Sequence, residues 1–341
     1  MPTTPYRYID IDNVLRPING GADIVVDTVP ETPTDWQVAF DTLDMRGTQP
    51  TRDPAEPIGP IMAWYLANTG RDTTLDYAVA ATSTVVVNNA WLNARNGNGR
   101  VSFVDGRWYV ERYEFNGTIR CGAHNVTFRN IFVNNTTDAF YAAQSRAVDG
   151  NASGIVFDHC TFQGNWTPSN STSINFSEAT EVDQITLQYC DISGWRGGLY
   201  SISGLTARYN WVHDLNFTFE SHNSGGGMRG RNNYFYRNLM ADGNSACLTW
   251  YAEYYPYTNN VAEQNIFRLQ ASDNGVETTM TTGGDKIYWE PEPGMNRELI
   301  GNLFYRGGNR GEGGGIGGAA APVGFTNVVG NIDRMGEAVV V

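Results

Sequence analysis

Charged residues are scarce in this chain, and acidic residues outnumber basic ones. Charged side chains make up 17% of the 341 residues, and 36 acidic against 23 basic residues give a net charge of −13. Phosphate backbones and anionic lipids repel such a chain, so we expect no nucleic-acid partner. No apolar run approaches the ~18 residues that a membrane span needs, so we expect no membrane insertion. Neutral glycans remain possible ligands.

Several familiar signatures are also missing. The zinc-binding spacings CxxC and HxxxH do not occur, so we expect no metal and no other cofactor. The glycines within residues 224–227 are followed by no Lys-Ser or Lys-Thr pair, which excludes a phosphate loop and favours a tight turn. The first residues lack the basic and apolar regions of a signal peptide, so we expect synthesis in the cytoplasm without ordinary export. The four cysteines are expected to stay reduced.

What the chain does contain is an internal repeat. Four copies align closely, in steps of 29, 30 and 20 residues, and looser copies follow them. The close copies begin at Val126, Ile155, Ile185 and Leu205, and the looser ones centre on Asn233, Asn265, Asn302 and Asn331. A period in this range indicates units that cannot bury an apolar face alone and must stack on their neighbours.

Each copy has the pattern of two short strands joined by a corner. Apolar residues at positions 1 and 3 alternate as in a strand, and no copy has helical spacing. A Cys or Asn then occupies the corner, and Asn tolerates a left-handed backbone there. We expect these corner residues to stack into an interior ladder: Cys160, Cys190, Asn210, Asn233, Asn265 and Asn302. The fold class is therefore all-β, a parallel β-helix.

The copies resemble those of the right-handed parallel β-helix family, which includes pectate lyases and many phage tailspikes. Residues 198–243, with an HDL corner and the sequence SHNSGGG, resemble the β-helix minor tail proteins of phages that infect Gram-positive, especially actinobacterial, hosts. The likeness covers roughly residues 82–335. It implies a right-handed solenoid, but this scaffold carries lyases, hydrolases and inert adhesins alike.

Two parts follow from the extent of the repeat. Residues 1–80 lie outside it and are rich in proline, and residues 61–66 have near-helical spacing. We expect this segment to cap an open end of the solenoid through a short helix, to attach the protein to another virion component, or both. Residues 81–341 form the β-helix, with loop insertions near 213–227, 247–259 and 280–296.

Acidic residues in the connections are the candidates for catalysis. Glycoside hydrolysis needs two carboxyl groups, roughly 5 to 10 Å apart, on either side of the bond. The candidates near the middle coils are Asp214, Glu220, Asp242 and Glu253. Their spacing does not fix them on one face, and solvated turn residues remain the alternative. His213 and His222 lie close enough in sequence to assist as acid or base, although a turn position also explains them.

An aromatic cluster is the candidate for glycan binding. Residues 250–257 contain five aromatics in eight positions, and a second aromatic segment lies one coil further on. Because stacked coils place corresponding segments side by side, the two are expected to be neighbours. The glycan-binding candidates are Trp250, Tyr251, Tyr254, Tyr255, Tyr257 and Trp289. Flat aromatic faces suit sugar rings, while packing of a loop or burial of a subunit interface are the alternatives.

Two functions are compatible with these features. The favoured hypothesis is a structural virion protein, a minor tail or tailspike-like protein that presents loops for host attachment. Its expected partners are other tail proteins and a host cell-surface glycan, its expected location is the virion, and it is expected to be a homotrimer or part of a larger assembly. The alternative is a polysaccharide depolymerase, a lyase or a glycoside hydrolase, acting on host surface glycans.

Overall fold

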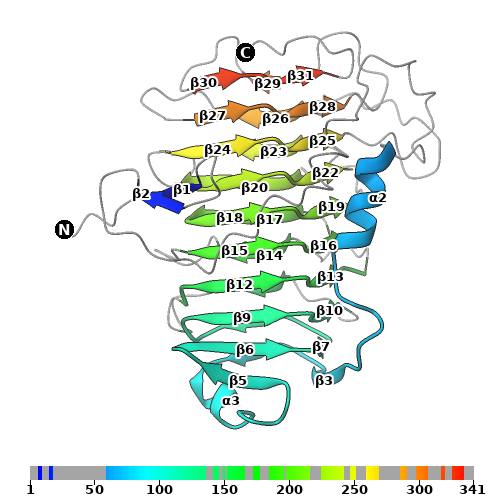
Figure 1. The fold of residues 1–341 in the computed structure, drawn as a ribbon, viewed down its shortest axis with the longest axis vertical. Coiled ribbons are helices and arrows are strands. Elements are labelled where there is room, and N and C mark those ends of the chain that lie inside the picture. The colour runs from blue at the N-terminus through cyan, green and yellow to red at the C-terminus, as the bar shows by residue number, and fades with distance from the viewer. Residues whose placement is uncertain are drawn as a thin grey trace.

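The chain folds into a parallel β-helix, which confirms the predicted all-β class (Figure 1). The computed structural model describes residues 7–9, 15–17, 59–135, 141–145, 149, 152–165, 172–176, 184–195, 197–215, 224–241, 246–250, 259–268, 285–289, 297–305, 316–318 and 325–333. Three sheets run along its axis, because successive coils each contribute one strand to each sheet, and their strands are parallel apart from one hairpin at the end. No helix within this described part is long and apolar enough to span a bilayer.

Sheets 1 and 2 are built from the predicted repeat. Ten strands form sheet 1: β5 (Val101–Val104), β6 (Arg107–Glu111), β9 (Val126–Arg129), β12 (Ile155–Asp158), β15 (Ile185–Gln188), β18 (Leu205–Arg208), β21 (Tyr234–Tyr236), β24 (Asn260–Glu263), β27 (Arg297–Ile300) and β30 (Phe325–Val329). Ten more form sheet 2: β3 (Ala78–Ala81), β7 (Tyr113–Phe115), β10 (Phe132–Asn134), β13 (Thr161–Gln163), β16 (Asp191–Ser193), β19 (Trp211–His213), β22 (Leu239–Ala241), β25 (Ile266–Arg268), β28 (Leu303–Tyr305) and β31 (Ile332–Asp333). The two strands and the corner of each copy are thus confirmed.

Sheet 3 contains a third strand from each coil, which the repeat did not predict. Its nine strands are β4 (Val85–Val87), β8 (Ile119–Cys121), β11 (Tyr141–Gln144), β14 (Thr172–Phe176), β17 (Gly197–Ser203), β20 (Ser224–Arg231), β23 (Ala246–Trp250), β26 (Asp285–Trp289) and β29 (Ile316–Gly318). Parts of all three predicted loop insertions therefore belong to a regular sheet.

The glycines within residues 224–227 lie in β20, so the predicted tight turn is wrong. Their role is close packing inside the sheet. A Cβ atom on Gly226 would lie 2.8 Å from Cε1 of Phe235, and one on Gly198 would lie 1.9 Å from the carbonyl oxygen of Gly225. Neighbouring backbones and core side chains occupy the space that other residues would need.

The corner between sheets 1 and 2 has a left-handed residue immediately before each ladder position. Its φ is 50° at His159, 54° at Tyr189, 56° at Tyr209 and 52° at Arg237. The left-handed conformation that the sequence suggested for the Cys or Asn itself therefore falls one residue earlier. This corner turns the chain and directs the next side chain inward.

A ladder of buried asparagines follows that corner. The Nδ2 atom of Asn210 donates to Oδ1 of Asn238 at 2.9 Å, and Asn238 donates in the same way to Asn265 at 2.9 Å. The ladder continues through Asn302 to Asn331. Asn233 was predicted in this ladder, and that prediction is wrong: Asn233 bonds to Asn260 at the opposite end of the sheet 1 strands.

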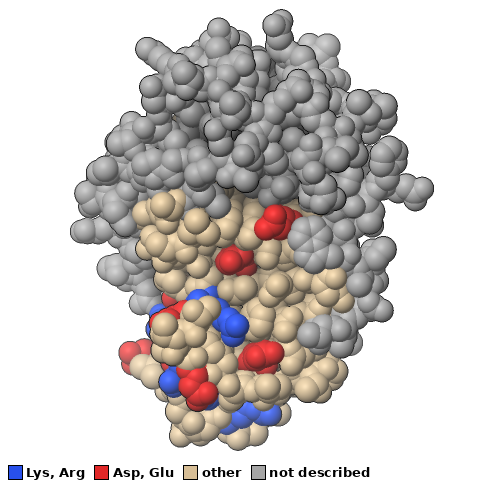
Figure 2. All heavy atoms as spheres, turned by 90° about the vertical axis from the view of Figure 1, so that its right-hand side faces the viewer, with Lys and Arg blue, Asp and Glu red and all other residues tan. Residues whose placement is uncertain are grey.

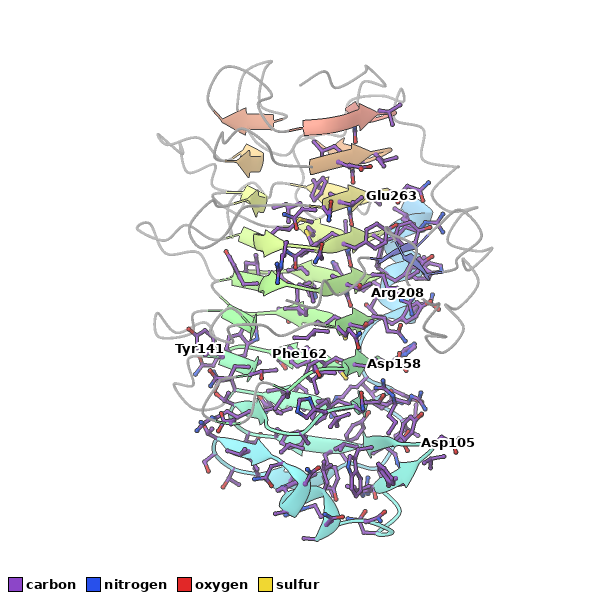
Figure 3. The ribbon with its side chains drawn as sticks, turned by 90° about the vertical axis from the view of Figure 1, so that its left-hand side faces the viewer. Asp105, Tyr141, Asp158, Phe162, Arg208 and Glu263 are labelled. Atoms are coloured by element: carbon purple, nitrogen blue, oxygen red, sulfur yellow. The ribbon has the colours of Figure 1, made fainter. Side chains whose placement is uncertain are left out.

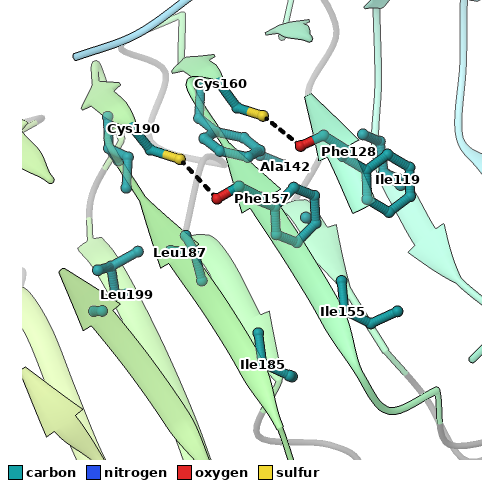
Figure 4. Close-up of a cluster of buried hydrophobic side chains, with 14 of the residues drawn as sticks. Ile119, Phe128, Ala142, Ile155, Phe157, Cys160, Ile185, Leu187, Cys190 and Leu199 are labelled. Carbon is teal, nitrogen blue, oxygen red and sulfur yellow. Dashed lines mark hydrogen bonds between the residues drawn. The ribbon is translucent and has the colours of Figure 1, made fainter. Parts of the chain in front are cut away.

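Cysteines take the ladder positions in the lower coils, as predicted for Cys160 and Cys190. The thiol of Cys160 donates to the carbonyl of Phe128 at 3.3 Å, and that of Cys190 to the carbonyl of Phe157 at 3.6 Å (Figure 4). Both cysteines are unpaired and fully buried. The rings of Phe128 and Phe157 stack at 4.9 Å beside them. Stacking identical positions in this way fills the core.

Helix α2 (Gly59–Asn68) lies on the flank of the solenoid beside the middle coils (Figure 1). The predicted helix is confirmed, but its expected position over an open end is wrong. Tyr65 donates its hydroxyl to the carbonyl of Arg237 at 2.6 Å, and the ring of Trp64 packs on Tyr189 and Tyr209. The hairpin of β5 and β6, with α3 (Asn89–Asn93), occupies the solenoid end instead.

The segment after α2 continues down the same corner as a strap. Gly70 donates its N–H to the carbonyl of Tyr189 at 2.8 Å, and Arg71 donates its N–H to Oγ1 of Thr161 at 2.9 Å. The N–H of Asp72 reaches Oδ1 of Asn130 at 3.2 Å. The strap thus crosses successive coils before β3 joins sheet 2. The separate antiparallel pair β1 (Arg7–Ile9) and β2 (Leu15–Pro17) precedes it in the chain.

Candidate functional site

The predicted site residues fall into three groups. Asp214 lies within the described residues. Trp250 and Trp289 are register partners on the adjacent strands β23 and β26, which confirms that the two aromatic segments are neighbours. Both share the register position of Met228, a core residue. The remaining candidates lie outside the described residues: Glu220, Asp242, Glu253, Tyr251, Tyr254, Tyr255 and Tyr257. Glycan binding by the aromatic cluster stays a prediction.

Asp214 belongs to an ion-paired triad at the end of sheet 2. His213 donates from Nδ1 to Oδ2 of Asp214 at 2.7 Å and from Nε2 to Oδ1 of Asp191, on the neighbouring strand, at 2.9 Å. The indole of Trp211 stacks on the imidazole with ring centroids 3.5 Å apart. The described surface on the α2 side of the solenoid is otherwise mostly uncharged, with a few acidic side chains and arginines (Figure 2).

The triad holds a protonated imidazole whose two N–H groups are both bound to carboxylates. Burial disfavours the imidazolium, but the hydrogen bonds and charges of Asp191 and Asp214 outweigh burial and raise the pKa of His213 to about 9. The hydrogen bond from His213 lowers the pKa of Asp214 below its ordinary value. A glycosidase acid needs the opposite shift. Asp214 is therefore a poor general acid, and the triad ties two coils together.

The stability that the triad contributes should depend on pH. The rise in the pKa of His213 from 6.5 to about 9 corresponds to roughly 3 kcal/mol. Because the folded pKa is raised, this contribution is complete below pH 6.5 and disappears as pH rises through about 9. We expect the difference in unfolding free energy between wild type and His213→Gln, from urea titrations, to shrink over that range. A difference that is constant with pH would contradict the ion-paired triad.

A row of polar side chains lines the outer face of sheet 1. It occupies the strand position before each corner, where inward and outward side chains alternate. The register row is Arg129, Asp158, Gln188, Arg208, Tyr236 and Glu263. Asp158, Arg208 and Glu263 lie one above another along the solenoid axis (Figure 3).

Asp158 is the fully paired member of this row. It accepts hydrogen bonds from Arg129 Nε at 3.0 Å and Gln188 Nε2 at 3.0 Å, and Nδ1 of His159 lies 2.8 Å from its Oδ1. Burial opposes the charge, yet these partners hold the pKa of Asp158 below its ordinary value. Asp158 therefore remains an ionised structural carboxylate.

Glu263 is the contrasting carboxyl group of the row. Its Oε2 accepts the hydroxyl of Tyr234 at 2.6 Å. Burial raises the pKa of Glu263 above its ordinary value and Glu298 adds to the rise, while Tyr234 and Arg237 act against it. Glu263 thus holds its proton more tightly than an exposed glutamate.

Glu298 is the second carboxyl group on this face. Glu298 pairs in register with Val261, two residues before Glu263, and both glutamates alternate with core residues of their strands. The strand spacing and rise place their Cα atoms about 8 Å apart. The rings of Tyr234 and Tyr236 stack at 5.6 Å next to them. The face therefore combines two carboxyl groups with aromatic side chains.

Sequence reasoning missed this face because it searched the connections between strands. Arg129, Asp158, Gln188 and Arg208 stand at position 4 of the four close copies, so an aligned polar column was visible. That column alone does not show which members are paired. No group of three or more His, Cys, Asp or Glu suited to a metal ion occurs among the described residues.

Comparisons with solved structures return weak structural likenesses, two of which follow. No family model and no curated protein matches the chain. A pectate lyase from Bacillus sp. N165, solved in complex with trigalacturonate, is 13% identical with a TM-score of 0.30, over 66% of this chain and 71% of that chain. The protein sacteLam55A from Streptomyces sp. SirexAA-E is 12% identical with a TM-score of 0.30, over 67% of this chain and 43% of that chain. Any function must therefore be argued from the geometry of this chain.

Proposed function

We propose that this protein hydrolyses a polysaccharide on the outer face of sheet 1, with Glu263 as general acid and Glu298 as the second carboxyl group. The observation that carries the proposal is the placement of these two groups on one face, one of them held by Tyr234. The proposal follows the depolymerase alternative, as a glycoside hydrolase. The expected phage location, tail-protein partners and homotrimer stay predictions.

The separation of the two glutamates fits the chemistry. Both side chains leave the same face of adjacent strands, so the carboxyl groups lie at a separation similar to the ~8 Å between their Cα atoms. Inverting glycosidases hold their carboxyl groups roughly 6.5 to 9.5 Å apart, which leaves room for a water molecule. Glu298 would take a proton from that water as its oxygen attacks the anomeric carbon. Glu263 would give its proton to the glycosidic oxygen as the bond to that oxygen breaks.

The environment of Glu263 suits the acid role. A general acid must keep its proton near the working pH, and burial shifts Glu263 in that direction. The 2.6 Å hydrogen bond from Tyr234 fixes the carboxyl group on the face. Below these residues, Thr186 and Thr206 are small and half-buried on the same outer face. A bound glycan chain would run over them along the solenoid axis.

Release of reducing ends from a panel of neutral and acidic polysaccharides tests the proposal. Glu263→Gln and Glu298→Gln keep the shape of the side chains, and each should lower the rate by about 100-fold or more. The wild-type rate should fall as pH rises through the raised pKa of Glu263, since the acid must be protonated. Glu114→Gln, at a half-buried glutamate on sheet 2, is the matched control and should stay within about twofold. Failure of wild type to cleave any polysaccharide, or full activity of Glu263→Gln, would refute it.

A further inference from the structure

Arg208 is a buried cation with no acidic partner among the described residues. Only 5% of its surface is exposed. Its Nε donates to Oε1 of Gln188 at 3.0 Å, and Nη2 donates to the same oxygen. Its remaining guanidinium nitrogen, Nη1, bonds to no described residue. The nearest carboxylate of the row, Asp158, is already bonded to Arg129, His159 and Gln188.

Other arginines of this chain show what is missing at Arg208. Arg120 makes two hydrogen bonds to Asp149, at 2.7 and 2.6 Å, and Arg129 pairs with Asp158. Arg208 is the more buried residue, and its only acceptor among the described residues is the neutral amide oxygen of Gln188. Burial lowers the pKa of Arg208, which reflects the unfavourable burial of its charge. A buried charge without a counter-charge is costly, and buried charges are normally paired.

We propose that Arg208 binds the acidic group, a carboxylate or a sulfate, of an anionic polysaccharide that lies along the outer face of sheet 1. The inference rests on the proposed function and names its substrate class. A guanidinium has five donors in a planar fork that matches the oxygens of such groups. An acidic group of the ligand would supply the counter-charge that the described residues do not.

The position of Arg208 relative to the two glutamates supports this assignment. Arg208, Tyr236 and Glu263 occupy one register row on consecutive strands. At the spacing between neighbouring strands, Arg208 lies about 10 Å along the axis from Glu263. An acidic sugar at Arg208 would therefore lie near, but not at, the bond to be cleaved. Thr206, two residues earlier on β18, is a small, half-buried residue on the same outer face.

A local anchor is also needed because the protein as a whole repels acidic ligands. The net charge is −13, so long-range electrostatics disfavour the approach of an anionic chain. Specific recognition must then come from a fixed cation at the contact. Among the described residues of sheet 1, the other cations are either bonded to carboxylates, as Arg129 is, or lie outside the strands next to Arg208. Arg208 lies in the same register row as Glu263.

Binding to the Glu263→Gln variant, measured by calorimetry, tests the inference without relying on turnover. The probes are a uronic-acid hexasaccharide, a sulfated hexasaccharide and an uncharged hexasaccharide. At least one acidic probe should bind about tenfold or more tighter than the uncharged probe. The added change Arg208→Gln should remove that preference, and Arg208→Lys should keep part of it. The uronate and sulfate arms show which acidic group is bound. Arg95→Gln, at the solenoid end, is the matched control and should leave the affinities unchanged.

Thermal unfolding of the same variants separates binding from a purely structural role. If Arg208 serves only to tie β15 to β18 through Gln188, Arg208→Gln should lower the melting temperature and leave the preference for acidic probes intact. If Arg208 binds the acidic group, Arg208→Gln should not lower the melting temperature and should remove the preference for acidic probes. Equal affinity for all three probes, or no binding of any probe, would overturn the proposal. Cleavage of neutral polysaccharides alone would refute the acidic substrate and keep the proposed hydrolase. Acidic binding without any cleavage would refute the hydrolase and keep the Arg208 site.

Discussion

Replacement of Asn265 by alanine is expected to lower the free energy of unfolding by about 4 kcal/mol. Asn265 is fully buried, and its Oδ1 accepts from both N and Nδ2 of Asn238 at 2.9 Å each. Its Nδ2 donates to the carbonyl of Phe235 at 2.8 Å and to Oδ1 of Asn302 at 3.1 Å. Alanine would leave the donors of Asn238 and the carbonyl of Phe235 buried without these partners. Such orphaned groups cost about 1 to 3 kcal/mol each.

Chemical denaturation measures this effect, and Asn93→Ala is the control. Asn93 is exposed on α3, so its replacement should change stability by less than about 0.5 kcal/mol. The ladder is a repeated element, so the same substitution at Asn238 or Asn302 should give a similar loss. A loss below about 1 kcal/mol at Asn265 would mean that the ladder does not stabilise the solenoid.

Gly198→Ala is expected to be at least as harmful, and to reduce the yield of folded protein. The added Cβ would lie 1.9 Å from the carbonyl oxygen of Gly225, 2.8 Å from its carbonyl carbon and 2.9 Å from Cγ1 of Val212. The first two atoms belong to the backbone of β20, which cannot move away without breaking the pairing of β17 with β20. We expect a loss of about 4 kcal/mol or more.

The control for Gly198→Ala is Gly97→Ala. Gly97 has φ of 81°, but a Cβ atom there would meet nothing within 4 Å. It should therefore show only the left-handed backbone penalty, about 1 to 2 kcal/mol. The melting temperature of Gly198→Ala reports the steric overlap, and that of Gly97→Ala reports the backbone strain alone. Equal stabilities would argue against the close contact of β17 and β20.

The extent of the fold that the sequence predicts depends on how regular each sheet is. Alternating residues such as Ile185 and Leu187 define the strands of sheet 1, and a two-strand unit with one corner follows directly from them. Sheet 3 is different because close backbone contacts require glycines at Gly198 and Gly226, and glycine breaks the alternating pattern. Strands there look like turns, although pairing with neighbouring coils makes them regular.

The ladder register illustrates a second limit. Asn233 and Asn238 belong to one coil, and each stands two residues before an apolar core residue. Both also follow a left-handed residue, Asn232 with φ of 59° and Arg237 with φ of 52°. Only the strand pairing shows that Asn233 precedes its strand and bonds to Asn260, whereas Asn238 follows the strand and bonds to Asn265. Local sequence does not separate two similar environments in one coil.

The candidate site shows the same division between local and tertiary information. The sequence placed Asp214 beside His213, but Asp191, which completes the triad, comes from a neighbouring coil. Glu263 and Arg208 look like ordinary outward-facing strand residues. What distinguishes them is their burial and their hydrogen-bond partners. The packing of neighbouring coils determines both.

We propose that a polysaccharide lies along the outer face of sheet 1, past Arg208 and between Glu263 and Glu298. A crystal structure of the Glu263→Gln variant with an acidic oligosaccharide tests it most directly. We predict the glycan over β15 to β27, with an acidic group on the guanidinium of Arg208 and a glycosidic oxygen within hydrogen-bond distance of residue 263. A glycan bound on sheet 2 beside Asp214, or on sheet 3, would show that sheet 1 is not the binding face.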